Sequence, residues 1–370
     1  MKILSIFGTR PEAIKMAPVI KLLKRSYPRL KSVVCVTAQH RQMLDQVLAL
    51  FDIVPDYDLN IMQANQSLSE LTANVMRRLD RLIADERPEW VLTQGDTTTA
   101  MVASLTAFYH RVKVGHVEAG LRTWDKYQPF PEEINRKIAD AVADLHFAPT
   151  PQSRDNLLRE GVSSESIVIT GNTVIDALLD VAQRPYDWES GPLAGLPRDR
   201  RIILVTAHRR ENFGEPLREI CRALAEIAAR WPEALIVYPV HLNPNVNQVV
   251  HERLSGIGNV RLLPPLDYLP LVQLMKFSFL ILTDSGGLQE EAPGLGKPVL
   301  VLRDVTERPE GVEAGTVRLV GTQKDVIVAE TAKLLEDSLE YQRMSRAVNP
   351  YGDGQASHRI IESLIGRGNS

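Results

Sequence analysis

Short apolar runs alternate with longer amphipathic stretches along almost the whole chain. The runs are rich in Val and Ile, and the stretches between them repeat apolar residues at helical spacing. Consecutive parallel strands need a crossover between them, usually a helix, so this order predicts an α/β fold with open parallel sheets. The expected strands are "KILSIFG" (2–8), "SVVCVTA" (32–38), "WVLTQGD" (90–96), "VKVGHVEA" (112–119), "LHFAPT" (145–150), "SIVITG" (166–171), "RIILVTAH" (201–208), "ALIVYPVH" (234–241), "VRLLPP" (260–265), "FLILTD" (279–284) and "PVLVLRD" (298–304).

The alternation is interrupted between Gln183 and Asp199. This stretch, "QRPYDWESGPLAGLPRD", carries three prolines and two glycines, which is typical of a surface loop near a domain junction. A chain of 370 residues also exceeds the usual size of one domain, about 150 residues. We therefore expect two Rossmann-like, doubly wound domains, residues 1–170 and 171–356.

Polar clusters follow the expected strands in both halves. Open parallel sheets bind ligands in the crevice beyond the carboxyl ends of their strands. Clusters in this position in each half predict a substrate cleft flanked by the two domains. The clusters are "GTRPE", "QGDTTT" and "HVEAGLRT" in the first half, and "TAHRREN", "YPVHLNP" and "TDSGG" in the second.

The segment "TDSGGLQEE" (283–291) leads from an apolar run into a turn and a short helix. Unpaired amides around Ser285, Gly286 and Gly287, with the helix dipole behind them, favour phosphate oxygens. Glu291 lies four residues after Gly287, on the same helix face and about 5.4 Å along the axis. A carboxylate there would repel phosphate but accept hydrogen bonds from ribose hydroxyls. The segment predicts a nucleotide diphosphate site; the plain alternative is an ordinary strand–turn–helix joint with a solvated Glu.

Two cations lie near the start of the first expected helix. Arg10 precedes Pro11, which we expect at the first helical position, and Lys15 follows one turn later. The helix dipole disfavours cations there, so a bound anion is their natural partner. The alternative is a pair of solvated surface cations.

Several titratable side chains follow or adjoin the strands. Crowded carboxylates raise one another's pKa, which suits proton transfer near neutral pH, although any one of them could simply serve a turn or an N-cap. A lone histidine is as often packed as functional. The candidates are Asp96, Glu118, Glu132, Glu133, His208 and His241.

Composition and missing motifs exclude several classes of function. A net charge of −3 provides no broad basic field for nucleic acid or anionic lipid. No stretch reaches membrane-spanning length, and the apolar start of the chain is too short for a signal peptide, so we expect a cytoplasmic protein. Cys35 and Cys221 are expected to be buried thiols, and no His/Cys spacing predicts a metal. Neither G-x-G-x-x-G after the first strand nor a P-loop motif occurs.

The polar clusters extend into longer motifs that resemble one family, the bacterial non-hydrolysing UDP-N-acetylglucosamine 2-epimerases. The resemblance covers essentially the whole chain in order, and it implies a GT-B-like fold whose C-terminal helix, about 357–370, packs back on the first domain. The motifs are "GTRPEAIKMAPVI", "QGDTTTA", "VGHVEAGLRT", "PFPEEINR", "TAHRREN", "YPVHLNP", "TDSGGLQEEAPGLGKPVLVLRD", "TERPEGVEAGT" and "NPYGDGQAS".

The resemblance also implies roles for individual residues. It places Asp96, Glu118 and Glu132 as catalytic carboxylates, leaving the adjacent Glu133 open. Its other implied site residues are Arg10 and Lys15 on the substrate, Ser285, Gly286 and Gly287 on the diphosphate with His208 and Arg308 nearby, and Glu291 on the ribose. Leu266 and Leu271 stand where some relatives carry polar or aromatic residues, so we expect backbone groups to bind the uracil.

The implied reaction interconverts UDP-GlcNAc and UDP-ManNAc, precursors of envelope polysaccharides. It proceeds by elimination of UDP to a 2-acetamidoglucal and re-addition, without NAD or another cofactor. The resemblance further implies a homodimer and an activating second UDP-GlcNAc. Asn65 stands where some relatives carry an Arg of that second site. The residues implied for the second site are Gln39, His40, Gln42, Arg209, Arg210 and His241.

Three other functions share parts of this pattern. A GT-B glycosyltransferase would share the nucleotide site but would need an acceptor and no carboxylate trio. A hydrolysing epimerase would release free ManNAc and UDP. A nucleotide-sugar sensor would need the diphosphate site without Asp96, Glu118 and Glu132 together.

Overall fold

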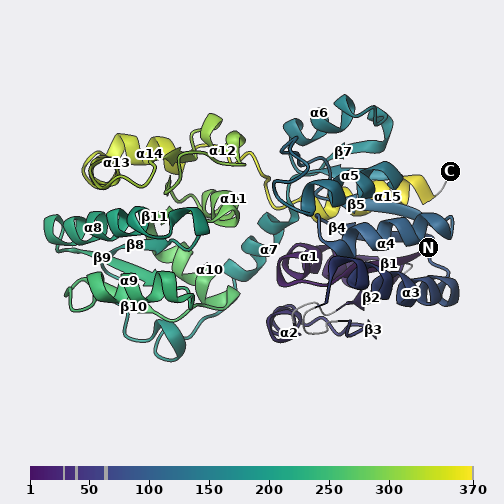
Figure 1. Cartoon of the computed structure of the whole chain (residues 1–370), viewed down its shortest axis with the longest axis horizontal. Helices are drawn as coiled ribbons and strands as arrows, with labels where there is room; N and C mark the ends of the chain where they lie inside the picture. The colour runs from purple at the N-terminus through teal and green to yellow at the C-terminus, as the bar shows by residue number, and fades with distance from the viewer. Residues whose placement is uncertain (28–29, 38–40, 62–65, 369–370) are drawn as a thin grey trace. The chain divides into compact units, whose positions relative to one another are not determined.

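The chain folds into two compact units, each built on its own sheet (Figure 1). The computed structural model describes residues 1–27, 30–37, 41–61 and 66–368. Unit 1 comprises Met1–Ala177 together with the C-terminal segment from Tyr351, and unit 2 comprises Leu178–Pro350. The chain passes from one unit to the other inside helix α7 (Thr173–Ala182).

The sheet of unit 1 is entirely parallel among its described strands, in the order β3-β2-β1-β4-β5-β6-β7. Residues 3–7 of β1 are fully buried, as expected of a strand covered by helices on both faces. The strands are β1 (Lys2–Phe7), β2 (Lys31–Val36), β3 (Tyr57–Asp58), β4 (Trp90–Gln94), β5 (Lys113–Val117), β6 (Leu145–Ala148) and β7 (Ile167–Ile169). The other helices of this unit are α1 (Arg10–Ser26), α2 (Arg41–Leu50), α3 (Leu68–Glu86), α4 (Thr98–Tyr109), α5 (Glu132–Val142), α6 (Pro151–Arg159) and α15 (Ala356–Gly368).

Unit 2 repeats this plan with the order β10-β9-β8-β11-β12-β13, again parallel throughout. Its strands are β8 (Arg201–Thr206), β9 (Ala234–Pro239), β10 (Val260–Leu263), β11 (Ser278–Thr283), β12 (Val299–Val301) and β13 (Val317–Leu319). Its helices are α8 (Glu215–Arg230), α9 (Pro244–Leu254), α10 (Tyr268–Phe277), α11 (Gly286–Gly294), α12 (Pro309–Glu313), α13 (Lys324–Glu336) and α14 (Ser338–Ser345).

The two sheets confirm the predicted α/β class and every expected strand. The structure also contains β3 and β13, two short edge strands that were not predicted from apolar runs in the sequence. Cys35 and Cys221 are buried free thiols, as predicted, and burial raises the pKa of each to about 12. In the described ranges no helix is long and apolar enough to span a bilayer.

Each sheet reverses its strand order at one place, between β1 and β4 in unit 1 and between β8 and β11 in unit 2. Such a switch point splays the two following loops apart and leaves a crevice at the carboxyl ends of the strands. The loops "GTR", "QGD", "AHRR" and "DSGG" follow these four strands. Topology therefore places most of the predicted polar clusters where an α/β sheet binds ligands.

Helix α15 belongs to unit 1 although it follows all of unit 2 in the chain. It packs against α1, and its Ile360, Ile361 and Leu364 are fully buried. Asp176 of α7 accepts hydrogen bonds from the backbone amides of Ala356 (3.2 Å) and Ser357 (2.8 Å) and so caps the start of the helix. In Figure 1 this yellow helix lies among the blue elements of unit 1.

Gly120, just after β5, is tightly packed against the backbone of Ser153 in unit 1. Its φ is +85°, and a Cβ built there would lie 2.2 Å from the carbonyl oxygen of Ser153. Gly161 has a nearly identical φ of +86° with nothing within 4 Å of such a Cβ. We predict that Gly120→Ala destabilises the protein by about 2–5 kcal/mol, from left-handed backbone strain plus overpacking. Gly161→Ala should cost only the strain, about 1–2 kcal/mol.

Thermal unfolding midpoints of the two variants check this. A larger loss for Gly120→Ala than for Gly161→Ala is expected, and equal losses would contradict the packing argument.

Candidate functional site

A buried carboxylate joins the two loops at the switch point of unit 1. Glu12 of α1 accepts hydrogen bonds from the amides of Gly8 (3.0 Å) and Thr9 (2.7 Å) and from the Thr97 hydroxyl (2.6 Å). Burial raises the pKa of Glu12, although these hydrogen bonds act to lower it. The loop after β1 and the loop after β4 are therefore held in one arrangement.

Glu118 lies directly after β5 with a left-handed φ of 64° and is almost fully buried. Its carboxylate oxygens lie 2.5 and 2.7 Å from Lys15 Nζ. Asn172 Nδ2 donates to Glu118 Oε1 at 2.8 Å, and Gln94 Nε2 donates to Oε2. The anion opposite Lys15 is thus the protein's own carboxylate, which several donors hold in place.

Asp96 is held through one of its two oxygens. Arg136 of α5 donates to Asp96 Oδ2 from Nε (3.0 Å) and Nη2 (2.6 Å), and Asn135 Nδ2 donates to the Asp96 carbonyl (2.9 Å). No residue that the structure describes binds Oδ1, and the side chain is 29% exposed. Asp96 can therefore offer a carboxylate oxygen to a ligand while Arg136 balances its charge.

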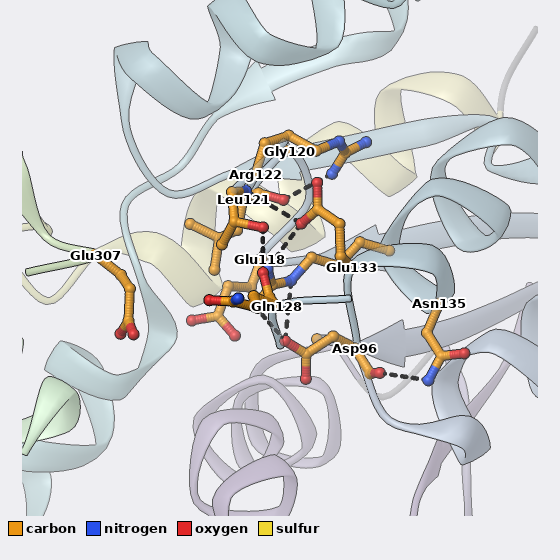
Figure 2. Close-up of polar contacts among 12 residues, drawn as sticks. Asp96, Glu118, Gly120, Leu121, Arg122, Gln128, Glu133, Asn135 and Glu307 are labelled. Atoms are coloured by element: carbon orange, nitrogen blue, oxygen red, sulfur yellow. Dashed lines mark hydrogen bonds and ion pairs between the residues drawn. The ribbon is translucent and has the colours of Figure 1, made fainter. Parts of the chain in front are cut away.

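Glu132 and Glu133 are adjacent in sequence but have different surroundings. Glu133 is fully buried and accepts hydrogen bonds from the amides of Thr123 and Trp124, both at 3.1 Å, and from Arg136 Nη1 at 3.2 Å. Glu132 is the first residue of α5, and its buried Oε2 has no partner among the described residues. Figure 2 shows contacts of Glu133 and of Asp96, including the one from Asn135, as dashed lines, and it also labels Glu118. The geometry assigns Glu133 to loop anchoring and leaves Glu132 available for chemistry.

Arg10 begins α1, so Pro11 is the second helical residue, one position later than expected. The half-buried Arg10 side chain has no hydrogen-bond or ion-pair partner in the described part of the chain. A guanidinium in the first turn of a helix, close to the dipole's positive end, favours a ligand anion as its partner.

In unit 2 the segment after β11 opens helix α11, with Ser285 as its N-cap. The amides of Gly286 and Gly287 stand in the first turn, where a helix has no carbonyl partners for them. A Cβ on Gly286 would lie 3.5 Å from Arg209 Nη2, so a guanidinium from the loop after β8 approaches the same turn. Amides, helix dipole and guanidinium together favour an anion such as a diphosphate.

Asp284 joins the two loops at the switch point of unit 2. It is fully buried, and its Oδ2 accepts hydrogen bonds from the amides of His208 (2.7 Å) and Arg209 (2.8 Å) and from Asn212 Nδ2 (3.0 Å). Its Oδ1 lies 3.6 Å from His208 Nδ1. The carboxylate therefore shapes the loop and faces the imidazole that the loop carries.

The His208 ring stacks on His241, with centroids 5.3 Å apart and planes at 10°. Burial lowers the pKa of His208; Asp284 opposes this, while His241 and Arg209 reinforce it. His241 Nδ1 accepts a hydrogen bond from the Asn243 amide at 3.1 Å. His208 is thus favoured as a neutral imidazole until an anion approaches it.

Glu290 and Glu291 separate into two environments. Glu291 Oε1 would lie 3.4 Å from a Cβ on Gly287, which places the two residues on one helix face as predicted, and its Oε2 accepts a hydrogen bond from Tyr268 at 2.8 Å. Glu290 forms an ion pair with Arg308. Glu291 therefore lies beside the first turn of α11, and Arg308 is held to the same helix.

Within unit 1 the structure brings Lys15 and Glu118 into contact and links Asp96 to α5, which begins at Glu132. Within unit 2 it brings Arg209 close to Gly286, His208 close to both Asp284 and His241, and Gly287 close to Glu291. Arg210 and His241 are exposed, Leu266 is buried and Leu271 lies half-buried in α10. Gln39, His40 and Asn65 fall outside the described residues, and of Gln42 only the backbone, in α2, is described.

Sequence reasoning missed the residues that position these groups. Two of these residues could have been found from the sequence. Arg136 lies four residues after Glu132 on the same helix, and Asp284 lies inside the motif "TDSGG". Asn172 carries no local signal, because only the fold brings it to Glu118. The missed positioning residues are Glu12, Gln94, Arg136, Asn172 and Asp284.

In the part of the chain that the structure describes, no group of three or more His, Cys, Asp or Glu side chains could hold a metal ion.

Comparisons with known proteins agree on one family. A family model described as UDP-N-acetylglucosamine 2-epimerase matches residues 23–365. The chain is 58% identical to the UDP-N-acetylglucosamine 2-epimerase of Salmonella typhimurium, covering 98% of each, and 54% identical to that of Bacillus subtilis, covering 99% of this chain and 95% of the relative. It is similar to the crystal structure of the Neisseria meningitidis UDP-GlcNAc 2-epimerase bound to UDP-GlcNAc, with a TM-score of 0.86 and 49% identity over 99% and 100% of the two chains. Such structural matches confirm the predicted GT-B-like α/β fold.

The contrast between Glu132 and Glu133 yields a stability prediction. Glu133→Gln removes a buried charge that three donors require, so we expect it to cost about 1–3 kcal/mol. Glu132→Gln should change stability by no more than about 0.5 kcal/mol, because no described partner is lost. Hydrogen-exchange protection of the α5 amides in the two variants measures the difference. Equal protection would show that Glu133 does not anchor the loop.

Proposed function

The chain belongs to the UDP-N-acetylglucosamine 2-epimerase family, and we propose that it interconverts UDP-GlcNAc and UDP-ManNAc by eliminating UDP and adding it back. The observation that carries this proposal is that Asp96 and Glu118 follow strands of unit 1, each paired with a half-buried cation, and that Glu132 begins the helix whose Arg136 pairs with Asp96. Relatives named for this substrate, one of them solved with UDP-GlcNAc bound, support it.

The chemistry explains why several acids are needed. In the proposed route a base removes the C2 proton, the C1–O bond breaks and UDP leaves with its electron pair, so that C1=C2 of a 2-acetamidoglucal forms. A proton then adds to C2 on the opposite face, and a UDP oxygen bonds again to C1. Proton-transfer groups are therefore required on both faces of the sugar ring, with cations or donors for the departing diphosphate. No redox cofactor takes part.

In unit 1 we assign the proton transfers to the carboxylates. Asp96 and Glu132 each keep an oxygen with no partner among the described residues, which proton transfer to or from a sugar carbon needs. Glu118 is held by Lys15, Gln94 and Asn172, and this fits a carboxylate that acts from one fixed position. Lys15 balances the charge of Glu118, and Arg10 would contact the substrate.

In unit 2 we assign nucleotide binding. The amides of Ser285, Gly286 and Gly287 would take the diphosphate, and Glu291, oriented by Tyr268, the ribose hydroxyls. His208 and Arg308 would steady the departing UDP, since an approaching phosphate counters the burial that lowers the pKa of His208. Backbone groups near Leu266 and Leu271 would bind the uracil.

Three further parts of the assignment remain predictions. We propose that the product supplies envelope polysaccharide synthesis in the cytoplasm. We propose that the protein is a homodimer. We also propose that a second UDP-GlcNAc activates it, and a strictly hyperbolic dependence of rate on substrate would argue against this.

The first test is incubation with UDP-GlcNAc in D2O, without NAD or acceptor, followed by proton NMR. We expect UDP-ManNAc carrying deuterium at C2, because the route exchanges the C2 proton. Free ManNAc and UDP would indicate a hydrolysing enzyme instead. An unchanged substrate would favour a transferase that needs an acceptor, or a nucleotide-sugar sensor.

Substitution of the carboxylates tests their roles. Asp96→Asn, Glu118→Gln and Glu132→Gln should each lower kcat by about 10²–10⁴-fold, the usual contribution of a general acid or base. Asp85→Asn removes an exposed carboxylate of α3 and is the matched control, expected to keep wild-type turnover. Initial rates of deuterium incorporation at C2 give the comparison, and wild-type rates in all three variants would refute the assignment.

A further inference from the structure

His116 is a buried histidine on β5 whose two ring nitrogens both face acceptors. Nδ1 lies 2.5 Å from Asp140 Oδ1, and Nε2 lies 2.7 Å from the carbonyl oxygen of Gly95. The side chain has no exposed surface. A backbone carbonyl can only accept, so Nε2 must carry a proton.

The proton on the Asp140 side can also be placed. Asp140 Oδ2 accepts hydrogen bonds from Arg122 Nη2 (2.7 Å) and from the Gly120 amide (3.3 Å). A protonated Asp140 would forfeit its charge beside the Arg122 guanidinium. Although burial acts to raise it, the pKa of Asp140 is lowered to about 2, chiefly by His116 and Arg122. Asp140 is therefore a carboxylate, and Nδ1 must be a donor as well.

The charged groups around His116 balance the positive charge of an imidazolium. Arg122 also pairs with Glu160, which in turn pairs with Lys137, so charges of alternating sign continue to the surface. His146 lies beside His116 across the β5–β6 pairing, and its Nε2 is 2.8 Å from the Asp140 carbonyl. Burial acts to lower the pKa of His116 and Arg122 adds to this, but Asp140 and the Gly95 carbonyl outweigh both and raise it.

The Gly95 carbonyl belongs to the turn that carries Asp96. Gly95 has a φ of +74°, and its amide donates to the Val117 carbonyl at 3.0 Å. The turn is thus held to β5 on both sides of Gly95, by Val117 through the amide and by His116 through the carbonyl.

Helix α5 supports this turn from the other side with residues four apart. Glu132, Arg136 and Asp140 therefore share one face of the helix. Asp140 binds His116, which holds the Gly95 carbonyl, and Arg136 binds the Asp96 carboxylate directly. This face of α5 thus fixes the turn at the Gly95 carbonyl and at the Asp96 carboxylate. Glu132 is the first residue of the same face.

We propose that His116 is a permanently charged imidazolium that positions Asp96 by holding the Gly95 carbonyl, without touching the substrate. The charge state stands on geometry alone, whereas the positioning of a catalytic Asp96 rests on the proposed function. The two parts therefore need separate measurements.

The charge state is tested in the full chain labelled with 15N at the ring nitrogens of its eight histidines. We expect one ring to show two protonated nitrogens from pH 6 to pH 8, and these signals should be missing in His116→Gln. A His116 ring with a single N–H that titrates at or below the ordinary histidine pKa would overturn the proposal. This result does not depend on any enzymatic activity.

Asp140→Asn supplies the pH-dependent test. Removing the carboxylate removes the main interaction that raises the pKa of His116, so its titration should move down into or below the neutral range. The 15N signals of this variant should then show Nδ1 losing its proton as pH rises through that titration, while Nε2 keeps its proton against the Gly95 carbonyl. A His116 titration unchanged from wild type would count against the ion pair.

Positioning is tested by kinetics of His116→Gln. We expect kcat for deuterium exchange at C2 to fall about 10–100-fold with KM within about twofold, because a displaced carboxylate weakens chemistry more than binding. His110→Gln is the control, since His110 also pairs with an aspartate, Asp80 (2.7 Å), but at a more exposed position at the end of α4. Wild-type kcat in His116→Gln would refute positioning even if the imidazolium is found. An inactive wild-type protein would refute the proposed function and leave the charge-state result in force.

Discussion

Both units depend on a buried carboxylate placed between two loops at the switch point of a parallel sheet. Glu12 does this in unit 1, where it collects two backbone amides and the Thr97 hydroxyl. Asp284 does it in unit 2 with two amides and Asn212. A crevice at the end of a sheet leaves backbone donors without strand partners, and a buried anion can satisfy several of them at once. The loops then present their remaining groups in a fixed arrangement.

The charged groups of unit 1 are arranged in pairs of opposite sign. Such pairs join Lys15 to Glu118 and Arg136 to both Asp96 and Glu133, and a chain of them runs from the buried His116 out to Lys137 at the surface. Breaking one partner of such a pair costs more than the pair contributes, because the remaining charge is left uncompensated. Charge pairing therefore makes the arrangement specific and keeps available the oxygens of Asp96 and Glu132 that no residue described in the structure binds.

The fold and the general location of the site could be predicted from sequence, because buried parallel strands read as continuous apolar runs and the polar clusters follow them. The edge strands β3 and β13 are too short for their sequences to be told apart from those of loops. The contacts that individual side chains of the site make were harder to predict. Sequence adjacency could not show that helix phase turns Glu133 inward while Glu132 keeps an oxygen that no described residue binds. Nor could it show that Asn172 meets Glu118, which comes 54 residues earlier and is reached only through the sheet.

The late return of helix α15 to unit 1 has a consequence for biosynthesis. On the ribosome, the seven described strands of unit 1 emerge before any of unit 2, but the helix that covers α1 emerges only after unit 2. At about 5–20 residues per second, translation of unit 2 takes roughly 10–30 s, during which the apolar surface meant for Ile360, Ile361 and Leu364 stays uncovered. Unit 2 is continuous in the chain and can complete its own core in that interval. Vectorial synthesis thus lets the second unit mature first, and the first unit is finished only after α15 has left the ribosome.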